Sequence, residues 1–171
     1  MNVIFMGYMG SGKSTLARLF AESIGLSAID LDDYISEKEK MSIPEIFEKK
    51  GEIYFRRIEG TYLNELLTSE GALILALGGG TPCYGNNMEL IKEKATSVYL
   101  RGSIPTLSKR LTNERSKRPL IASLEPEQLT EYIAKHLFER RAYYEQADHI
   151  IAIDNKTPHE IMKEIKAIEL L

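Results

Sequence analysis

Cysteine, long apolar runs and an excess of basic residues are all missing or scarce in this sequence. The 171 residues include one cysteine, Cys83, which has no partner for an internal disulfide bond. No apolar run approaches the ~20 residues that a membrane-spanning helix needs. Lysine and arginine number 22 against 25 aspartate and glutamate residues, and the net charge of −3 provides no basic field for nucleic acid or anionic lipid. We therefore expect a cytoplasmic protein in a reducing compartment, with no membrane and no nucleic-acid partner.

Internal repeats, low-complexity tracts and flexible linkers are absent as well. The composition, with 43% hydrophobic and 27% charged residues, is close to the average for globular proteins. A chain of this length buries roughly two thirds of its unfolded surface around one core. These features predict a single domain over residues 1–171, and we expect it to act as a monomer.

Short apolar segments recur along the chain, with helical patterns between them. They occupy residues 3–6, 72–77, 97–100 and 149–153. Such runs are typical of strands that are buried on both faces, as in parallel sheets covered by helices. Strands that alternate with helices predict an α/β fold, a three-layer α/β/α sandwich with a central parallel sheet and ligands at the strand ends.

Two of the expected helices have recognisable ends. Apolar side chains repeat at helical spacing over residues 16–24, and Gly25 stands where a C-terminal cap is expected. Ser42 and Glu45 have the spacing of a capping box, with Pro44 in the first turn. We expect one helix from residue 43 to about residue 67.

The most specific motif is residues 7–14, GYMGSGKS, which fits G-x-x-x-x-G-K-[ST] between an expected strand and an expected helix. Its glycines allow consecutive N–H groups to point at phosphate oxygens, helped by the positive end of the following helix. Lys13 would reach the β- and γ-phosphates, and the Ser14 hydroxyl would ligate Mg²⁺ as cofactor. The predicted ATP-binding residues of this motif are Gly10, Ser11, Gly12, Lys13, Ser14 and Thr15.

Two other nucleotide-binding classes share parts of this pattern. Residues 10–12 (GSG) resemble half of the dinucleotide-binding motif G-x-G-x-x-G, with Asp30 at about the right distance. Thr15 replaces the third glycine, however, and Lys13 has no role in that motif. A switch GTPase would need Asp-x-x-Gly and Asn-Lys-x-Asp segments, which the sequence lacks. The pattern favours an ATP-dependent phosphotransferase.

A carboxylate cluster, Asp30, Asp32 and Asp33, follows the short apolar residues 27–29 and would lie at a strand end beside the phosphate motif. In a kinase, one carboxylate can hold Mg²⁺ through water while another orients the acceptor hydroxyl or takes its proton. Aspartate is also favoured at helix N-caps, so a purely structural role stays open for this cluster.

Residues 112–124 are polar, basic and proline-bearing, with Arg115, Lys117 and Arg118 within four positions. This composition suits a mobile lid over a ligand, and it equally suits an ordinary solvated loop. Both interpretations stay open on composition alone.

Three further segments complete an ordered set: residues 51–59 (GEIYFRRIE), 77–81 (LGGGT) and 139–144 (ERRAYY). With the phosphate motif and the pair of carboxylates, in this order and spacing, they resemble the shikimate kinase family of the P-loop nucleoside-monophosphate-kinase-like superfamily. The resemblance spans residues 3–158. It implies a P-loop NTPase fold and transfer of the ATP γ-phosphate to the 3-hydroxyl of shikimate, in aromatic amino-acid (chorismate) biosynthesis.

The resemblance also implies which residues bind the acceptor. Arg56 and Arg140 correspond to the pair that grips the shikimate carboxylate, a task suited to the planar guanidinium fork. Asp32 corresponds to the acceptor-binding aspartate and candidate base, and Asp30 to the carboxylate nearer Mg²⁺, which leaves Asp33 as the helix cap. The remaining substrate-binding residues are three glycines whose backbone can approach the substrate, Gly78, Gly79 and Gly80.

Further implied features are an acceptor-binding segment at about residues 32–60 and a lid at about residues 112–124. Arg118 corresponds to the lid cation that neutralises charge on the transferred phosphoryl group. Arg110 and the loop of residues 155–158, which includes Asn155, correspond to adenine-side contacts of ATP. The catalytic residues implied in this way are Lys13, Asp32 and Arg118.

Two neighbouring arginine pairs leave the register of the motifs open. Arg141 follows Arg140, where the family's usual Pro-Leu-Tyr appears as residues 142–144 (AYY), and Arg57 follows Arg56. Only one arginine of each pair should face the acceptor.

Two alternative functions stay open. One is a gluconate or other small-metabolite kinase on the same fold, and the other is a catalytically silent nucleotide-binding regulator.

Histidine and cysteine have no expected catalytic role. His136, His149 and His159 lie far apart in the sequence without the spacing of metal ligands, so surface or core positions are expected for them. Cys83 is expected to be a passive loop residue.

Overall fold

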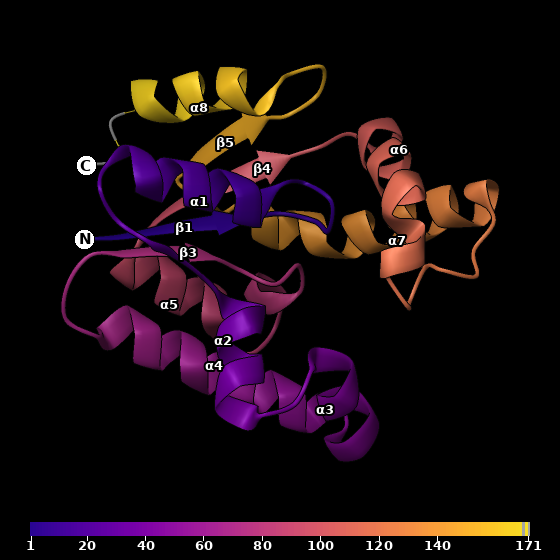
Figure 1. Ribbon diagram of the computed structural model, residues 1–171, viewed down its shortest axis with the longest axis horizontal. Coiled ribbons are helices and arrows are strands. Elements are labelled where there is room, and N and C mark those ends of the chain that lie inside the picture. The colour runs from indigo at the N-terminus through magenta and orange to yellow at the C-terminus, as the bar shows by residue number, and fades with distance from the viewer. Residues whose placement is uncertain (169, 171) are drawn as a thin grey trace.

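Five parallel strands form a central sheet in the computed structural model, which describes residues 1–168 and 170 (Figure 1). The strands are β1 (Asn2–Met6), β2 (Ala28–Asp30), β3 (Leu73–Ala76), β4 (Thr96–Arg101) and β5 (His149–Ala152). Their order across the sheet is β2-β3-β1-β4-β5. The central strand, β1, pairs with β3 through Val3 and Ile74 and with β4 through Phe5 and Val98. All four apolar segments that were expected to be strands are therefore confirmed.

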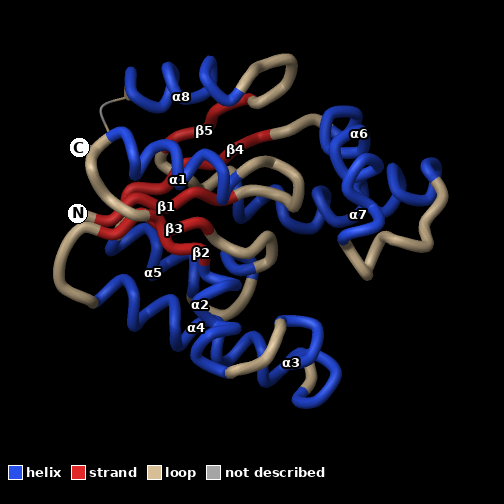
Figure 2. Tube along the Cα trace, in the orientation of Figure 1, coloured by secondary structure: helices blue, strands red, loops and turns tan. Residues whose placement is uncertain are grey.

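Helices connect the strands and cover both faces of the sheet (Figure 2). They are α1 (Lys13–Ser23), α2 (Leu31–Glu39), α3 (Ile43–Lys50), α4 (Glu52–Thr68), α5 (Asn87–Lys94), α6 (Ile104–Glu114), α7 (Pro126–Tyr144) and α8 (Pro158–Ala167). Two short 3-10 turns are η1 (Thr81–Cys83) and η2 (Arg115–Lys117). Among residues 1–168 and 170, no helix combines the length and the apolar character that crossing a bilayer requires.

Alternate residues of the strands point into two separate cores, because successive side chains of a strand face opposite sides of the sheet. Val3 and Phe5 pack with α1 and α8, whereas Ile4 and Met6 pack in the core that α4, α5 and α7 complete. Both faces of the sheet are covered, which explains why β1 is apolar from Val3 to Met6 and β3 is apolar throughout. The predicted three-layer α/β/α sandwich is confirmed.

The helix expected from residue 43 to about residue 67 is broken in two. Ser42 and Glu45 form the predicted capping box, and α3 begins after them. It ends at Gly51, which has a φ of +85° and a ψ of 170°, a conformation that only glycine adopts readily. The chain then changes direction into α4, so the prediction of one continuous helix was wrong (Figure 1).

The polar segment 112–124 contains more local structure than a plain loop. α6 continues to Glu114, so the first three residues of the segment are helical, and η2 and turns follow. The Arg115 guanidinium donates to the Leu124 carbonyl at 2.6 Å, and Ile121 is fully buried. The hydrogen bond joins two parts of the segment itself, and Ile121 anchors the middle of the segment in the core.

Candidate active site

The phosphate loop, residues 7–14, connects β1 to α1 at the carboxyl edge of the sheet. Gly10 and Gly12 have φ angles of +79° and +90°, in the left-handed region that favours glycine. The Lys13 ammonium folds back over the loop and donates to the Tyr8 carbonyl at 3.0 Å. The loop therefore has the backbone conformation that the motif predicts at the start of a helix.

Ser14 and Asp30 lie against each other beside the loop. The Ser14 hydroxyl donates a hydrogen bond to Asp30 Oδ2. The other oxygen of Asp30 caps α2, because it accepts from the N–H groups of Asp32 at 3.0 Å and Asp33 at 3.4 Å. The expectation that Asp33 caps this helix was wrong, since β2 extends through Asp30 and α2 begins directly after it. A hydroxyl beside a carboxylate offers the oxygen ligands that Mg²⁺ prefers.

A first cavity, of about 490 Å³, lies over the phosphate loop. Residues 10–15, the predicted ATP-binding residues of the motif, all line it. Arg110 of α6 also lines it and donates to a loop carbonyl at 3.2 Å, while α8 contributes Pro158. Asn155 is exposed and is not among the lining residues. The fold therefore brings Arg110 and the end of the 155–158 loop to the cavity, and it leaves Asn155 outside the cavity.

A second cavity, of about 730 Å³, lies between the α3–α4 region, α7 and the polar segment before α7. Five residues line both cavities: Met9, Asp32, Gly78, Gly79 and Arg118. A molecule bound over the phosphate loop and another bound in the second cavity would therefore meet beside one carboxylate and one guanidinium.

Arg56 faces the second cavity, and Arg57 does not. Arg56 Nη1 donates to Glu59 Oε1 at 2.9 Å, and the other oxygen of Glu59 accepts from the Thr81 hydroxyl at 2.8 Å. Arg57 is exposed and lies over the Tyr54 ring. Glu59, 1% exposed, holds the arginine in place and was not assigned a role from the sequence. Its position three residues after Arg56, one helical turn away, is the signal that could have identified it.

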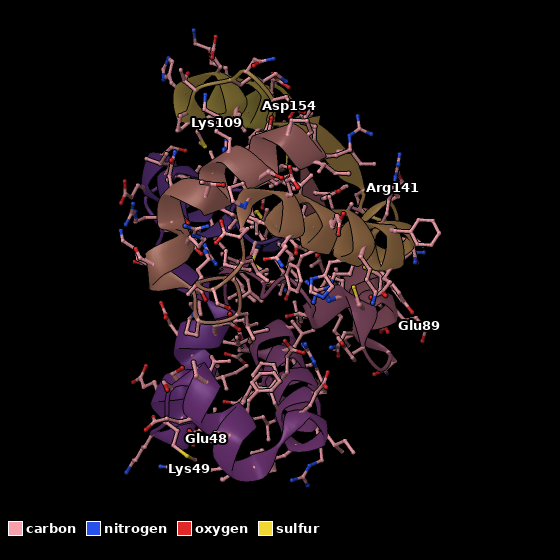
Figure 3. The ribbon with its side chains drawn as sticks, turned by 90° about the vertical axis from the view of Figure 1, so that its right-hand side faces the viewer. Glu48, Lys49, Glu89, Lys109, Arg141 and Asp154 are labelled. Atoms are coloured by element: carbon pink, nitrogen blue, oxygen red, sulfur yellow. The ribbon has the colours of Figure 1, made fainter. Side chains whose placement is uncertain are left out.

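The second arginine pair is resolved in the same way. Arg140 is half-buried and lines the second cavity. Arg141 is exposed and forms an ion pair with Glu145 at 2.6 Å, and Figure 3 shows it at the outer surface of α7. Consecutive helical residues point about 100° apart, so only one of two adjacent arginines can face the cavity. Arg56 and Arg140 are those that do.

The three glycines after β3 leave room for three charged side chains. A Cβ atom added to Gly78 would lie 2.9 Å from Asp32 Oδ1, and one added to Gly80 would lie 2.9 Å from both terminal nitrogens of Arg56. A Cβ at Gly79 would lie 3.3 Å from Arg140 Nη1. None of the three has the positive φ that would demand glycine. Their requirement for glycine is therefore one of space.

Burial shifts the pKa values of two oppositely charged groups, Asp32 at the junction of the two cavities and Lys13 in the phosphate loop. Burial, with the nearby Asp30 and Glu59 carboxylates, raises the pKa of Asp32 to about 6. Burial lowers the pKa of Lys13 to about 8, although Asp32 and Asp30 partly oppose that shift. Between these two values the carboxylate and the ammonium are both charged. A carboxylate with this pKa can take up a proton near neutral pH.

Arg118 stands between the two cavities, but a carboxylate restrains it. Its guanidinium contacts Glu114 Oε2 through Nη2 at 3.0 Å and through Nε at 3.3 Å. Both side chains are partly exposed, at 37% and 46%, so the ion pair is weak enough to exchange. Arg118 can therefore change partner at little cost.

Comparison with known proteins agrees with this geometry. The model of the shikimate kinase family matches residues 9–169. The shikimate kinase of Flavobacterium johnsoniae is 48% identical over 164 residues, which cover 95% of each chain, and that of Flavobacterium psychrophilum is 41% identical over 97% of each. The chain belongs to the shikimate kinase family.

Solved structures of the family have the same fold. The shikimate kinase of Bacteroides thetaiotaomicron superimposes with a TM-score of 0.92 at 30% identity, covering 100% of this chain and 99% of that one. The Acinetobacter baumannii shikimate kinase in complex with shikimate gives 0.84 at 33% identity, over 98% and 91% of the chains. A gluconokinase from Sinorhizobium meliloti gives 0.59 at 20% identity, a likeness of fold alone. As a shikimate kinase family member, the chain is an ATP-dependent phosphotransferase.

Proposed function

We propose that this chain transfers the γ-phosphate of ATP to the 3-hydroxyl of shikimate, forming ADP and 3-phosphoshikimate for aromatic amino-acid biosynthesis. The observation that carries the proposal is the meeting of the two cavities beside Asp32 and Arg118. One cavity contains the phosphate loop, and the other presents Arg56 and Arg140. Two guanidinium groups suit an acceptor with a carboxylate, the anionic group that shikimate carries.

The acceptor-binding segment, about residues 32–60, supplies the groups that orient shikimate. Its carboxylate would lie between Arg56 and Arg140, with the backbone of Gly79 beside the ring. In that orientation the ring hydroxyls would point towards Asp32, which lines both cavities. The position of the two arginines thereby selects which hydroxyl can react.

In the transfer step, the 3-hydroxyl oxygen bonds to the γ-phosphorus and the bond from that phosphorus to the β-phosphate oxygen breaks. The hydroxyl proton passes to Asp32, whose raised pKa suits a base near neutral pH. Lys13 and Arg118 surround the transferred group with positive charge. Arg118 would leave Glu114 for the phosphoryl group when the lid, about residues 112–124, closes and excludes water.

Ser14 and Asp30 fit a magnesium ion, as a hydroxyl and a carboxylate that already lie in contact. We propose that they hold Mg²⁺, with Asp30 acting through water. The described residues form no cluster of three or more acidic, histidine or cysteine ligands, so phosphate oxygens and water would complete the coordination. When bound, Mg²⁺ would offset the negative charge of the phosphates.

The test is release of ADP from Mg·ATP with shikimate, beside parallel reactions with quinate, gluconate, nucleoside monophosphates and no acceptor. Turnover on shikimate alone is the expected result. Turnover only on gluconate would identify a different small-metabolite kinase on the same fold. ATP binding without turnover on any acceptor would identify a silent nucleotide-binding regulator instead.

We also propose that the enzyme works as a monomer in the cytoplasm. The groups that the proposed reaction uses, Lys13, Asp32, Arg118 and the two arginines of the second cavity, already lie along the two cavities of a single copy. ATP as co-substrate and the free thiol of Cys83 suit a reducing, ATP-containing compartment. A sedimentation-equilibrium mass near 19.4 kDa is the expected result, and twice that mass would contradict the monomer.

A further inference from the structure

Tyr8, the second residue of the phosphate loop, makes contacts in three directions. Its carbonyl accepts the hydrogen bond from Lys13 at 3.0 Å. Its ring faces the Arg140 guanidinium, whose central carbon lies 5.7 Å from the ring centroid. Its hydroxyl forms a 3.0 Å hydrogen bond with His136 Nδ1 on α7. The side chain is 1% exposed, so all three contacts are made inside the protein.

The phosphate motif does not call for an aromatic residue at this position, which is unrestricted in G-x-x-x-x-G-K-[ST]. The buried hydroxyl of Tyr8 and its partner lie away from the first cavity, because Tyr8 does not line it. Phosphate binding therefore leaves the ring and hydroxyl of Tyr8 unexplained. Their contacts point instead to α7 and to Arg140.

The two arginines of the second cavity are held by different means. Arg56 is fixed by the buried Glu59 carboxylate. Within the part of the chain that the structure describes, no carboxylate forms an ion pair with Arg140. The Arg140 guanidinium contacts the Tyr144 hydroxyl and faces the Tyr8 ring, and neither of these neutral groups cancels its charge. Arg140 thus keeps its whole charge available for a ligand.

His136 and Arg140 lie four residues apart on α7, one turn along the same helix face. Tyr132, one turn earlier, packs its ring edge against His136 with centroids 4.2 Å apart. The bond from Tyr8 to His136 therefore joins the phosphate loop to the helix turn that carries Arg140.

We propose that Tyr8, anchored by His136, is a positioning residue that sets Arg140 against the phosphate loop for binding of the acceptor carboxylate. The inference rests on the proposed function, because it assumes an acceptor whose carboxylate Arg140 binds. Tyr8 acts through Arg140 and touches neither the transferred phosphoryl group nor the reacting hydroxyl.

The test compares Tyr8→Leu, Tyr8→Phe and His136→Leu with Tyr143→Phe, a matched control on the exposed side of α7. Loss of the ring in Tyr8→Leu is expected to raise the KM for shikimate about tenfold. Loss of the hydrogen bond alone, in Tyr8→Phe or His136→Leu, should raise it about threefold. In these variants the KM for Mg·ATP and kcat should change by less than about twofold, because the Tyr8 carbonyl is retained. In the control, Tyr143→Phe, the KM for shikimate should also change by less than about twofold. Equal increases in both KM values would overturn the proposal.

Two further measurements separate positioning from a general loss of structure. The double variant Tyr8→Phe/His136→Leu should be no worse than either single variant, because both remove the same bond. An acceptor whose carboxylate is reduced to a primary alcohol should show no KM difference between the native protein and Tyr8→Leu. Thermal unfolding checks that each variant folds. If Tyr8→Leu does not fold, the KM values of Tyr8→Phe and His136→Leu test the proposal.

Failure of the inference and failure of the proposed function give different results. If the native protein does not phosphorylate shikimate, the proposed function fails and the acceptor is wrong. If the native protein does so, and all three variants keep its KM for shikimate, the positioning role of Tyr8 alone is wrong.

Discussion

The phosphate loop takes its groups from eight consecutive residues, whereas the second cavity takes its charged groups from helices far apart in the sequence. In the loop, left-handed glycines shape the backbone around the place for a phosphate. In the second cavity, Arg56 comes from α4 and contacts Glu59, and Arg140 comes from α7 and faces the Tyr8 ring. A motif of contiguous residues forms its binding groups once its local backbone is folded. A cavity whose charged side chains come from distant helices forms only when the whole chain is folded.

This difference predicts a division of effects between variants. Changes in the second cavity should alter acceptor binding and leave ATP binding intact. Changes at the junction should affect the chemical step, because Asp32 and Arg118 line both cavities. The following predictions test that division, starting from the largest expected effect.

Asp32→Asn should lower kcat about a thousandfold, because the amide cannot take the proton of the acceptor hydroxyl. Its Kd for ATP should change by less than about threefold. Asp33→Asn is the matched control, since Asp33 is exposed one residue further along the same helix. Steady-state rates and an equilibrium titration with ATP measure both effects. Native-like turnover in Asp32→Asn would remove Asp32 from the mechanism.

Arg56→Ala and Arg140→Ala should each raise the KM for shikimate about a hundredfold, since a charge-assisted hydrogen bond contributes about 1.5–3 kcal/mol. Arg57→Ala and Arg141→Ala, the exposed neighbours, should change it by less than about twofold. Initial rates over a range of shikimate concentrations distinguish the two sets. A large effect at Arg57 or Arg141 would mean that the acceptor approaches from another side.

Two glycine variants should each change one kinetic constant about tenfold, one of them the KM for shikimate and the other kcat. Gly80→Ala would push the Arg56 guanidinium aside and raise the KM for shikimate, whereas Gly78→Ala would displace Asp32 and lower kcat. Steady-state kinetics with both substrates varied give the two constants. Equal losses in kcat and KM in both variants would show that the glycines serve the backbone and not these side chains.

The plot of kcat/KM against pH should fall on both sides of neutrality, because Asp32 titrates on the acid side and Lys13 on the basic side. Asp32 loses its negative charge below its pKa of about 6, so activity should fall about tenfold per pH unit in acid. Lys13 loses its positive charge above its pKa of about 8, so activity should also fall in base. Any residual activity of Asp32→Asn should lack the acid limb. A flat profile from pH 5 to 7 would contradict the raised pKa of Asp32.

Local patterns predicted much of the fold correctly. The apolar runs became strands because a run flanked by helical segments can bury both of its faces only in a covered sheet. Ser42 and Glu45 formed their capping box because both partners lie within one turn. Gly25 has the left-handed φ of +73° expected at the end of α1 for the same reason.

Three other features depended on how the elements pack and where they end: the helix break at Gly51, the cap of α2 and the surroundings of His136. Gly51 breaks the helix although the apolar pattern continues across it, because its positive φ turns α4 onto the core. Asp30 and Asp33 are equally good caps by composition, and the extent of β2 selected Asp30. His136, for which a surface or core position without a catalytic role was expected, forms a hydrogen bond with Tyr8, a contact that its place in the sequence did not predict.

By itself, the sequence determined the fold class, the phosphate loop and the family, because these follow from contiguous residues or from an ordered set of motifs. Only the tertiary structure decided that Arg56 and Arg140 face the second cavity while Arg57 and Arg141 face solvent. It also decided that Glu59 holds one arginine and Tyr8 faces the other. The physical reason is that a side chain's direction depends on the packing of its helix, which residues far away in the sequence determine.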